Sequence, residues 1–413
     1  MDMLKLSRRE FGGLALVAGS QTRRLLGAAG IGETLRAGLE RRKIPAAAAM
    51  VATLDETVYA GAFGKRDSAS SVALQTDSIF RIASMTKAIT TTAAMQLVEQ
   101  GKLHPDRPVA EHLPELGKPE VLEGFDPAGK PILRPARKPI LLKHLMTHTS
   151  GLVYDNWDAV LKRYNQVTSS ARPPGTAAPV APLRFEPGAR WEYGTGIDWT
   201  GKLVETVSGL TLEQYFQRNI LQPLGMKDTS YLLPEEKFGR LVSTHRRQPD
   251  GSLKEEPRAM PSPPKAFNGG GGLYCTVEDY TRFMQMILRK GRSAGKDQVL
   301  SAKSVELMSA NQIGSVNVEK LISTDHSLSE DVEMHPGAMD KYTFGFLLNP
   351  AAYPGGRSAG SLAWAGIENT FYWIDPRRSL CAVIMMQYYP FVDKEAVALL
   401  GDFEQSVYRN LPG

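Results

Sequence analysis

The chain has 413 residues, of which 42% are hydrophobic and 23% are charged, and these proportions are typical of a globular protein with material for a large core. Its formal net charge of +5 is small for this length, and its basic residues are scattered, so no nucleic-acid surface is expected. Beyond the N-terminus no apolar stretch approaches the length of a membrane-spanning helix, so stable membrane insertion is not expected either.

Residues 1–30 leave two alternatives open. Arg8-Arg9 followed by a mildly apolar run over 12–18 is typical of a twin-arginine export signal. The run is short, however, and no small-x-small cleavage site is clear, so an uncleaved helical extension of a cytosolic enzyme fits as well. The sequence therefore leaves the localisation open between the bacterial cytoplasm and the periplasm.

Cysteine and histidine usage indicates neither a disulfide nor a metal site. Cys275 and Cys381 lie far apart in apolar surroundings and are predicted to be small core residues. The seven histidines show no spacing of the H-E-x-x-H kind that binds zinc. No cofactor is expected.

The first half of the chain predicts a helix, a hairpin and a largely helical segment. A helical pattern over 32–42 stops at Pro45, and an antiparallel hairpin follows over 46–53 and 58–64. Ala88 begins a long helical pattern that ends near Gly101. From about 105 to 265, helical segments punctuated by proline and glycine predominate, including 141–148 and 198–208, and a proline-rich stretch interrupts them at 171–179.

The last third returns to strands. Four consecutive glycines at 269–272 mark the change, and Thr276, three residues before Asp279, predicts a capped helix start. A second hairpin is predicted over 369–375 and 379–387, and a helix over 394–411 closes the chain.

Strands at both chain ends predict an α+β fold with an antiparallel sheet flanked by helices. Residues 31–100 and 266–413 would build this α/β domain, and 101–265 would form a mostly helical domain. We expect the ligand site in the cleft between them.

The motif Ser84-Met85-Thr86-Lys87 precedes the long helix and is the first candidate for chemistry. A serine at a helix start lies near unpaired N–H groups and the positive end of the helix dipole. The lysine one turn later lies on the same face, so its amine can reach the serine hydroxyl. Together they offer a nucleophile and a base. On this motif alone, a helix-capping serine with a solvated lysine is an equal alternative.

Three further segments extend this candidate site. Tyr193 follows a turn and precedes a helix, so its hydroxyl could move protons, although a core tyrosine is the alternative. His148, in the turn-rich stretch 148–152, is predicted to shape the floor of the site and not to pair with the serine. The small residues of Trp364-Ala365-Gly366-Ile367 would let a strand backbone approach a bound acyl group.

Together these segments resemble the serine β-lactamase and penicillin-binding-protein superfamily over roughly residues 30–405. They are most similar to the family VIII carboxylesterases and the lovastatin acyltransferase-like subgroup. The stretches that carry the resemblance are Ser84 to Lys87, Leu145 to Leu152, Tyr193 to Trp199, Trp364 to Gly366 and Val121 to Asp126.

The resemblance implies a β-lactamase-like fold and specific roles at the site. Ser84 would be the acylated nucleophile, and Lys87 and Tyr193 would share the roles of general base and acid. The backbone N–H groups of Ser84 and Ile367 would form the oxyanion hole. Trp364 would lie in the substrate site.

The wall of the substrate pocket is predicted from position along the chain. Tyr154 and Trp157 stand in a loop between motifs, so we expect them to line the pocket together with Trp364, Ala365 and Gly366.

Two departures from the β-lactamase pattern bear on the substrate. Thr195 stands where those enzymes carry the asparagine of Tyr-x-Asn, and Trp364 stands where they carry the lysine of Lys-Thr-Gly. The chain therefore lacks two groups that hold a β-lactam, and a neutral carboxylic ester is expected as the small-molecule partner.

The expected activity is hydrolysis of short- to medium-chain carboxylic esters through an acyl-Ser84 intermediate. The alternatives are an acyltransferase that uses the same acyl-enzyme, a weak β-lactamase or penicillin-binding peptidase, and a non-catalytic member of the fold. The stretch from Gly356 to Gly360 spells the G-x-S-x-G pattern of α/β-hydrolases, but no helical pattern follows it, so Ser358 is not expected to be the nucleophile. The sequence leaves the oligomeric state open.

Overall fold

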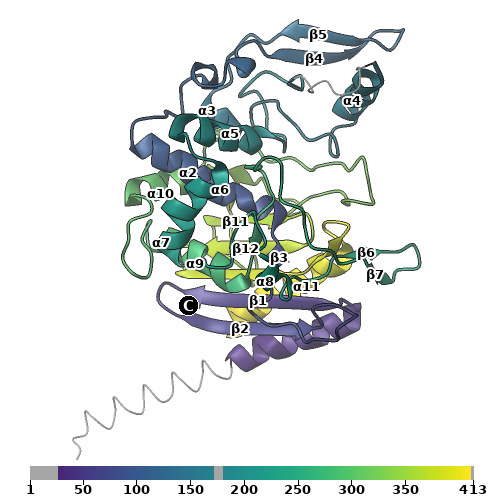
Figure 1. Ribbon diagram of the computed structural model, residues 1–413, viewed down its shortest axis with the longest axis vertical. Coiled ribbons are helices and arrows are strands. Elements are labelled where there is room, and N and C mark those ends of the chain that lie inside the picture. Colours follow the sequence, from purple (N-terminus) through teal and green to yellow (C-terminus); the bar gives the residue numbers. More distant parts are fainter. Residues whose placement is uncertain (1–26, 172–179, 411–413) are drawn as a thin grey trace, which may run out of the picture.

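The computed structural model describes residues 27–171 and 180–410 (Figure 1). Most of the segment with the predicted export signal, residues 1–26, and most of the proline-rich stretch, residues 172–179, therefore lie outside the described residues. Among the described helices, none combines the length and the apolar character needed to cross a membrane.

Strands from both ends of the chain form one antiparallel sheet, which confirms the predicted fold class (Figure 1). The N-terminal hairpin joins the C-terminal strands because β1 pairs with β13, with Ala48 opposite Met385 and Thr53 opposite Leu380. The sheet order is β2-β1-β13-β12-β11-β10-β9. Its strands are β1 (Ala46–Thr53), β2 (Thr57–Gly64), β9 (Lys341–Tyr342), β10 (Leu347–Asn349), β11 (Ser361–Gly366), β12 (Thr370–Asp375) and β13 (Leu380–Met385).

Helices cover both faces of this sheet. Neighbouring side chains of a strand point to opposite faces. On β12, Tyr372 packs against Tyr280 of α9 (Val277–Leu288) with ring centroids 4.8 Å apart, whereas Trp373 packs against Phe403 of α11 (Lys394–Asn410) at 5.5 Å. All six residues of β12 are buried as a result. The central strands therefore lie in a core that extends to both sides of the sheet.

The helices to which the sequence analysis gave residue ranges are present, with small shifts at their ends. The helix over 27–42 packs beside α11, and Arg42 forms an ion pair with Asp402 there at 2.7 Å. The remaining helices are α2 (Thr86–Glu99), α3 (Leu142–Met146), α4 (Ala159–Ala171), α5 (Gly196–Ser208), α6 (Leu212–Phe216), α7 (Gln222–Leu224), α8 (Glu235–Phe238), α9 (Val277–Leu288), α10 (Ala302–Ser309) and α11 (Lys394–Asn410). Short 3₁₀ turns are η1 (Ala83–Met85), η2 (Val109–Glu111) and η3 (Pro114–Leu116), and η4 (Gln217–Leu221) is a π-helical turn.

The segment 101–265 contains strands that the sequence analysis did not predict. The hairpin of β4 (Glu120–Phe125) and β5 (Pro131–Pro135) projects at one end of the molecule (Figure 1). A register shift between Leu122 and Gly124 interrupts its alternation, so the period of two was not recognisable. β6 (His245–Arg247) pairs with β7 (Leu253–Glu255) and with β14 (Tyr388–Tyr389).

A short two-stranded sheet places the candidate nucleophile. β3 (Phe80–Arg81) pairs with β8 (Tyr274–Cys275) and leads directly into η1, which contains Ser84. Cys275 on β8 and Cys381 on β13 are both buried and free, as predicted.

Candidate active site

Ser84 lies at a strained start of the long helix. It occupies η1, which continues into α2, and its predecessor Ala83 has a φ of 42°, in the left-handed region that non-glycine residues rarely adopt. The Ser84 amide stands in the first turn, where no intrahelical carbonyl precedes it. The backbone thus presents both the Ser84 hydroxyl and its N–H at the helix start.

Lys87 is buried and not solvated, which rules out the alternative of a helix-capping serine with an exposed lysine. The Lys87 side chain is fully inaccessible to solvent. Its Nζ donates to the Gly270 carbonyl at 2.6 Å, to the Ser84 Oγ at 3.2 Å and to the Tyr154 hydroxyl at 3.2 Å. A buried ammonium requires such acceptors, and here they fix the amine beside the serine.

Tyr193 completes the group around Ser84. Its hydroxyl donates to Ser84 Oγ at 2.7 Å, although the two residues are 109 positions apart in the chain. The Lys87 Nζ lies 4.8 Å from the centre of the Tyr193 ring. The structure therefore brings the three predicted catalytic side chains within hydrogen-bonding distance at one oxygen atom.

The Tyr193 loop is held by backbone contacts that require glycine. The Tyr154 amide donates to the Tyr193 carbonyl, and the Thr195 amide donates to the Leu152 carbonyl. A Cβ on Gly194 would collide with the Leu152 carbonyl, so only glycine lets the two loops approach this closely. Close packing between the two loops thus explains why the residue after Tyr193 is a glycine.

His148 lies behind Tyr193, in line with the predicted structural role. Its ring contacts the Tyr193 ring edge-on at 4.8 Å, and its Nδ1 accepts a hydrogen bond from the Gly194 amide at 3.4 Å. Burial, with a further contribution from the Lys87 charge, lowers the pKa of His148 well below 6.5. The imidazole is therefore neutral at physiological pH and supports the Tyr193 loop.

The glycine run at 269–272 has a role that the sequence analysis did not identify. The Gly270 carbonyl accepts from Lys87, and the Gly269 carbonyl accepts from the Thr90 hydroxyl at 2.7 Å. A Cβ on Gly270 would lie 2.5 Å from the Asp198 carboxylate, and one on Gly269 would lie 2.5 Å from the Ile197 carbonyl. Glycines are needed because this loop passes between α2 and α5.

A narrow apolar cavity of about 20 Å³ adjoins Ser84. Trp157, Trp364 and Ala365, which were expected in the pocket wall, line it. Ile367, expected to give a backbone N–H to the oxyanion hole, lines the same cavity as Ser84. Its other lining residues, besides Ser84 and Tyr193, are Leu321, Val332, Met334 and Phe391. These four residues were not predicted, because three of them lie in an irregular segment whose side chains show no periodicity. Phe391 follows β14, and its nearness to a buried strand is the one feature of the sequence that points to it.

Tyr154 and Gly366 differ from the prediction that they line the substrate pocket. Neither belongs to the cavity wall. The Tyr154 hydroxyl points to Lys87 and Asp198 because it hydrogen-bonds to both. Gly366 is small for another reason, since a Cβ there would collide with the Ile82 carbonyl just before the nucleophile. Its size lets β11 approach the Ser84 segment.

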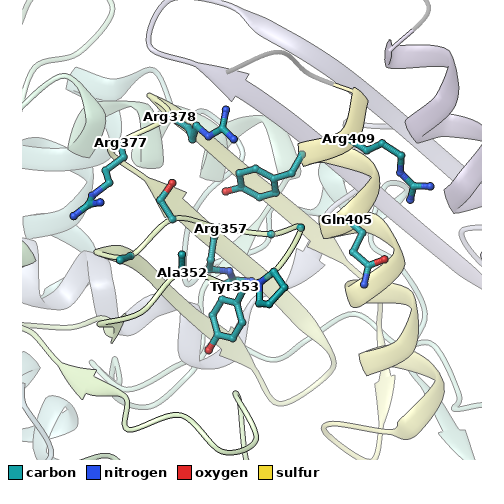
Figure 2. A pocket seen from close by; sticks show the side chains of 13 residues that line it. Ala352, Tyr353, Arg357, Arg377, Arg378, Gln405 and Arg409 are labelled. Carbon is teal, nitrogen blue, oxygen red and sulfur yellow. The ribbon is translucent and has the colours of Figure 1, made fainter.

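The G-x-S-x-G stretch is a surface loop, as expected. Residues 356–360 lie between β10 and β11, and residues 356–359 line a separate, open pocket with Arg377, Arg378 and Arg409 (Figure 2). No helix follows Ser358, whose amide donates to the Asp375 carboxylate at 2.8 Å. The geometry of a nucleophile elbow, a serine between a strand and a helix, is not present here.

The same loop is attached to α11 by a buried ion pair. Arg357 Nε donates to Glu404 Oε1 at 2.9 Å, and a second guanidinium nitrogen contacts Oε2. Burial alone would raise the pKa of Glu404, but the Arg357 charge and hydrogen bonds outweigh it and hold this pKa below 4.5. The ion pair therefore contributes its full stabilisation at pH values above the unfolded-state pKa of Glu404. This stabilisation is lost as the pH falls through the folded-state pKa of Glu404.

We expect Arg357→Met to lower the free energy of unfolding by about 3 kcal/mol at pH 7, because it leaves Glu404 buried without its partner. Urea unfolding at pH 7 and below pH 4 measures this, and the difference from wild type should shrink at the lower pH. The double variant Arg357→Met/Glu404→Met is the control and should recover most of the loss. An equal loss at both pH values would contradict this explanation.

No cluster of three or more His, Cys, Asp or Glu side chains suited to a metal ion occurs within residues 27–171 and 180–410. The groups that meet at Ser84 are a hydroxyl, an amine and a phenol. Such a set can attack a carbonyl and relay the proton to a leaving group.

Comparisons with known proteins agree with this geometry. The family model described as Beta-lactamase matches residues 31–403. Monacolin J acid methylbutanoyltransferase of Aspergillus terreus is 32% identical over 402 residues, which cover 90% of this chain and 94% of that protein. Lovastatin esterase of Penicillium rubens is 31% identical over 373 residues, covering 85% and 91%.

A solved structure is similarly close. Unliganded simvastatin synthase from Aspergillus terreus aligns with a TM-score of 0.78 at 29% identity, covering 92% of this chain and 98% of that one. The match to the family model extends over most of the chain and includes every residue of the site around Ser84. The chain belongs to the Beta-lactamase family.

Proposed function

We propose that the protein is a serine acyltransferase that forms an acyl-Ser84 intermediate and passes the acyl group to an alcohol. The observation that carries this proposal is the convergence of Tyr193 and Lys87 on one atom, Ser84 Oγ, at 2.7 and 3.2 Å. A hydroxyl in contact with an amine and a phenol, at the start of a helix, is equipped for acyl transfer.

The reaction proceeds in two halves. Ser84 Oγ bonds to the acyl carbon as its proton passes to the Lys87–Tyr193 pair, and the carbonyl electron pair moves to the oxygen held by the Ser84 and Ile367 amides. The tetrahedral intermediate collapses, and the leaving group departs with the proton, for which Tyr193 is the donor nearest to Ser84 Oγ. In the second half an alcohol attacks the acyl carbon, its proton follows the same route, and Ser84 is restored.

The apolar lining of the cavity supports an apolar acyl group as the group that is transferred. Trp157, Trp364 and Met334 surround the cavity, so a bound acyl chain would face hydrocarbon and ring carbons. Apolar walls also reduce the access of water, and limited access of water protects an acyl-enzyme from hydrolysis. Two relatives that align over 90% of this chain are named as methylbutanoyltransferases, which supports a short branched acyl group as the group transferred.

The test is the fate of the acyl group. We expect the purified protein, given a 2-methylbutanoyl thioester and a bulky secondary alcohol such as monacolin J acid, to form the ester faster than free 2-methylbutanoic acid. Chromatography with mass detection measures both products as the alcohol concentration rises. Release of free acid alone at every alcohol concentration would contradict acyl transfer.

Carboxylic ester hydrolysis is the second candidate, and it is the activity expected from sequence alone. The relative named lovastatin esterase, which aligns over 85% of this chain, favours it. In this case water replaces the alcohol in the second half of the reaction. The product analysis above separates the two, because both share the acyl-Ser84 intermediate.

We also expect β-lactam turnover to be weak. Trp364 lines the cavity at the place of the lysine that would bind a β-lactam carboxylate, and its ring lies 5.0 Å from the Tyr193 ring. A carboxylate there would lose water without gaining a cation. The kcat/KM for nitrocefin should be at least about 100-fold below that for p-nitrophenyl butyrate. Comparable values for the two substrates would refute this specificity.

A further inference from the structure

Asp198 lies in the first turn of α5 and faces the active site without touching Ser84. The Tyr154 hydroxyl donates to its Oδ2 at 2.8 Å, and the same hydroxyl accepts from the Lys87 Nζ at 3.2 Å. The chain Asp198–Tyr154–Lys87–Ser84 is thus continuous. The proposed reaction gives this carboxylate no part, and the expected role of Tyr154 in the pocket wall does not explain it.

The direction of these hydrogen bonds is fixed by the chemistry of the groups. A tyrosine hydroxyl has one proton to donate. When Tyr154 donates this proton in its hydrogen bond to Asp198, only lone pairs of the Tyr154 oxygen face Lys87. Burial and the neighbouring Asp198 charge raise the pKa of Tyr154 well above 10, so the phenol keeps that proton. Tyr154 can therefore act only as an acceptor towards Lys87.

This constraint determines where the Lys87 amine points. The Gly270 carbonyl, at 2.6 Å, is also an acceptor only. Two of the Nζ protons are thus assigned to Tyr154 and Gly270, and one tetrahedral position remains, which faces Ser84 Oγ at 3.2 Å. In the neutral amine this position is a lone pair that can take the serine proton; in the ammonium it is a proton that can be donated.

The carboxylate itself is held in place by close packing. The Asp198 oxygens lie where a Cβ on Gly270 would approach them to 2.5 Å, so the glycine loop closes over them. The start of helix α5 packs closely against the Leu145 backbone, since a Cβ on Gly196 would lie 2.5 Å from the Leu145 carbonyl oxygen. Asp198 therefore has little freedom to turn away from Tyr154.

We propose that Asp198 is a positioning residue that, through Tyr154, orients the Lys87 amine towards Ser84. This inference rests on the proposed acyl-enzyme reaction and adds to it the Asp198 carboxylate, which does not contact Ser84. In the isosteric variant Asp198→Asn the amide can donate to Tyr154, which frees the phenol proton to turn towards Lys87 and disturbs the orientation of the amine.

The test is the acylation rate of Asp198→Asn with a p-nitrophenyl ester as a function of pH. We expect kcat/KM to fall about 10- to 100-fold with KM little changed. We also expect the pH–rate profile to differ from that of wild type, because a neutral amide replaces the carboxylate that is hydrogen-bonded to the relay through Tyr154. The other ionisable groups facing Lys87 are Tyr154, Tyr193 and the neutral His148, and they remain in place.

The matched control is Glu205→Gln, on the same helix, which removes one carboxylate but keeps an acceptor for the Leu212 amide. It should leave the rate and the pH profile unchanged. A merely structural effect of Asp198→Asn would lower thermal stability without moving the profile, so the melting temperature is measured for each variant.

A double-mutant cycle then tests the route through Tyr154. If Asp198 acts by orienting Tyr154, adding Asp198→Asn to Tyr154→Phe should lower the rate by less than about twofold. Independent, additive losses would overturn the proposed route, and an unchanged rate and profile for Asp198→Asn would overturn the proposal. Either result, with Ser84→Ala inactive, leaves the proposed function intact; an active Ser84→Ala would remove the function itself.

Discussion

Ser84→Ala should lower kcat for ester or thioester cleavage by at least about 10⁴-fold, because removing the nucleophile of such a set costs as much as removing the whole set. Ser84 Oγ is the atom on which Tyr193 and Lys87 converge, at 2.7 and 3.2 Å, so no other described hydroxyl has the same environment. Residual activity would come from the oxyanion amides and the pocket alone.

Intact-protein mass spectrometry tests the same step directly. Wild type, quenched in acid during turnover, should carry one acyl group on Ser84, and Ser84→Ala should carry none. Ser358→Ala is the control, since Ser358 has the G-x-S-x-G motif but stands in a surface loop, and it should be labelled like wild type. A fluorophosphonate adduct on Ser358 in place of Ser84 would contradict the assignment of the nucleophile.

The residues that meet at Ser84 Oγ could be predicted because each lies in a short motif whose local geometry is encoded nearby. Ser84 and Lys87 are one helical turn apart, so their contact follows from the period of the helix. Tyr193 is exposed to the site by a turn, and its distance to Ser84 followed from the family resemblance. The sheet was predictable for a similar reason, because both hairpins have short turns and apolar strands.

The rest depended on contacts between distant segments. The Tyr154–Asp198 hydrogen bond joins residues 44 positions apart, and neither residue type indicates its partner. The cavity wall from Leu321, Val332 and Met334 comes from irregular chain, where side-chain direction has no period. The sequence identifies Gly270 only as part of a glycine run that marks a change of region, and Gly366 was expected to line the pocket. The roles of both depend on the neighbouring atoms that a Cβ would contact.

Lys87→Ala should lower kcat/KM by about 10⁴-fold, the upper range for a lost general acid–base group. The Lys87 Nζ lies 3.2 Å from Ser84 Oγ and 4.8 Å from the centre of the Tyr193 ring, so its loss removes the amine that exchanges protons with Ser84 and adjoins the phenol. Steady-state kinetics with a p-nitrophenyl ester measures the effect, and we expect KM to change little because Lys87 does not line the cavity.

A pair of variants separates the missing amine from disturbed packing. Lys87→Ala leaves a space at a fully buried position, so added methylamine or ethylamine should restore part of the rate. Lys87→Met fills the same space with an apolar chain, so amines should not rescue it. Its melting temperature should stay close to that of wild type, because removing a buried ammonium offsets the two acceptors left unpaired at Tyr154 and Gly270. If both variants stay folded and retain more than a tenth of the wild-type rate, Lys87 is not part of the proton relay.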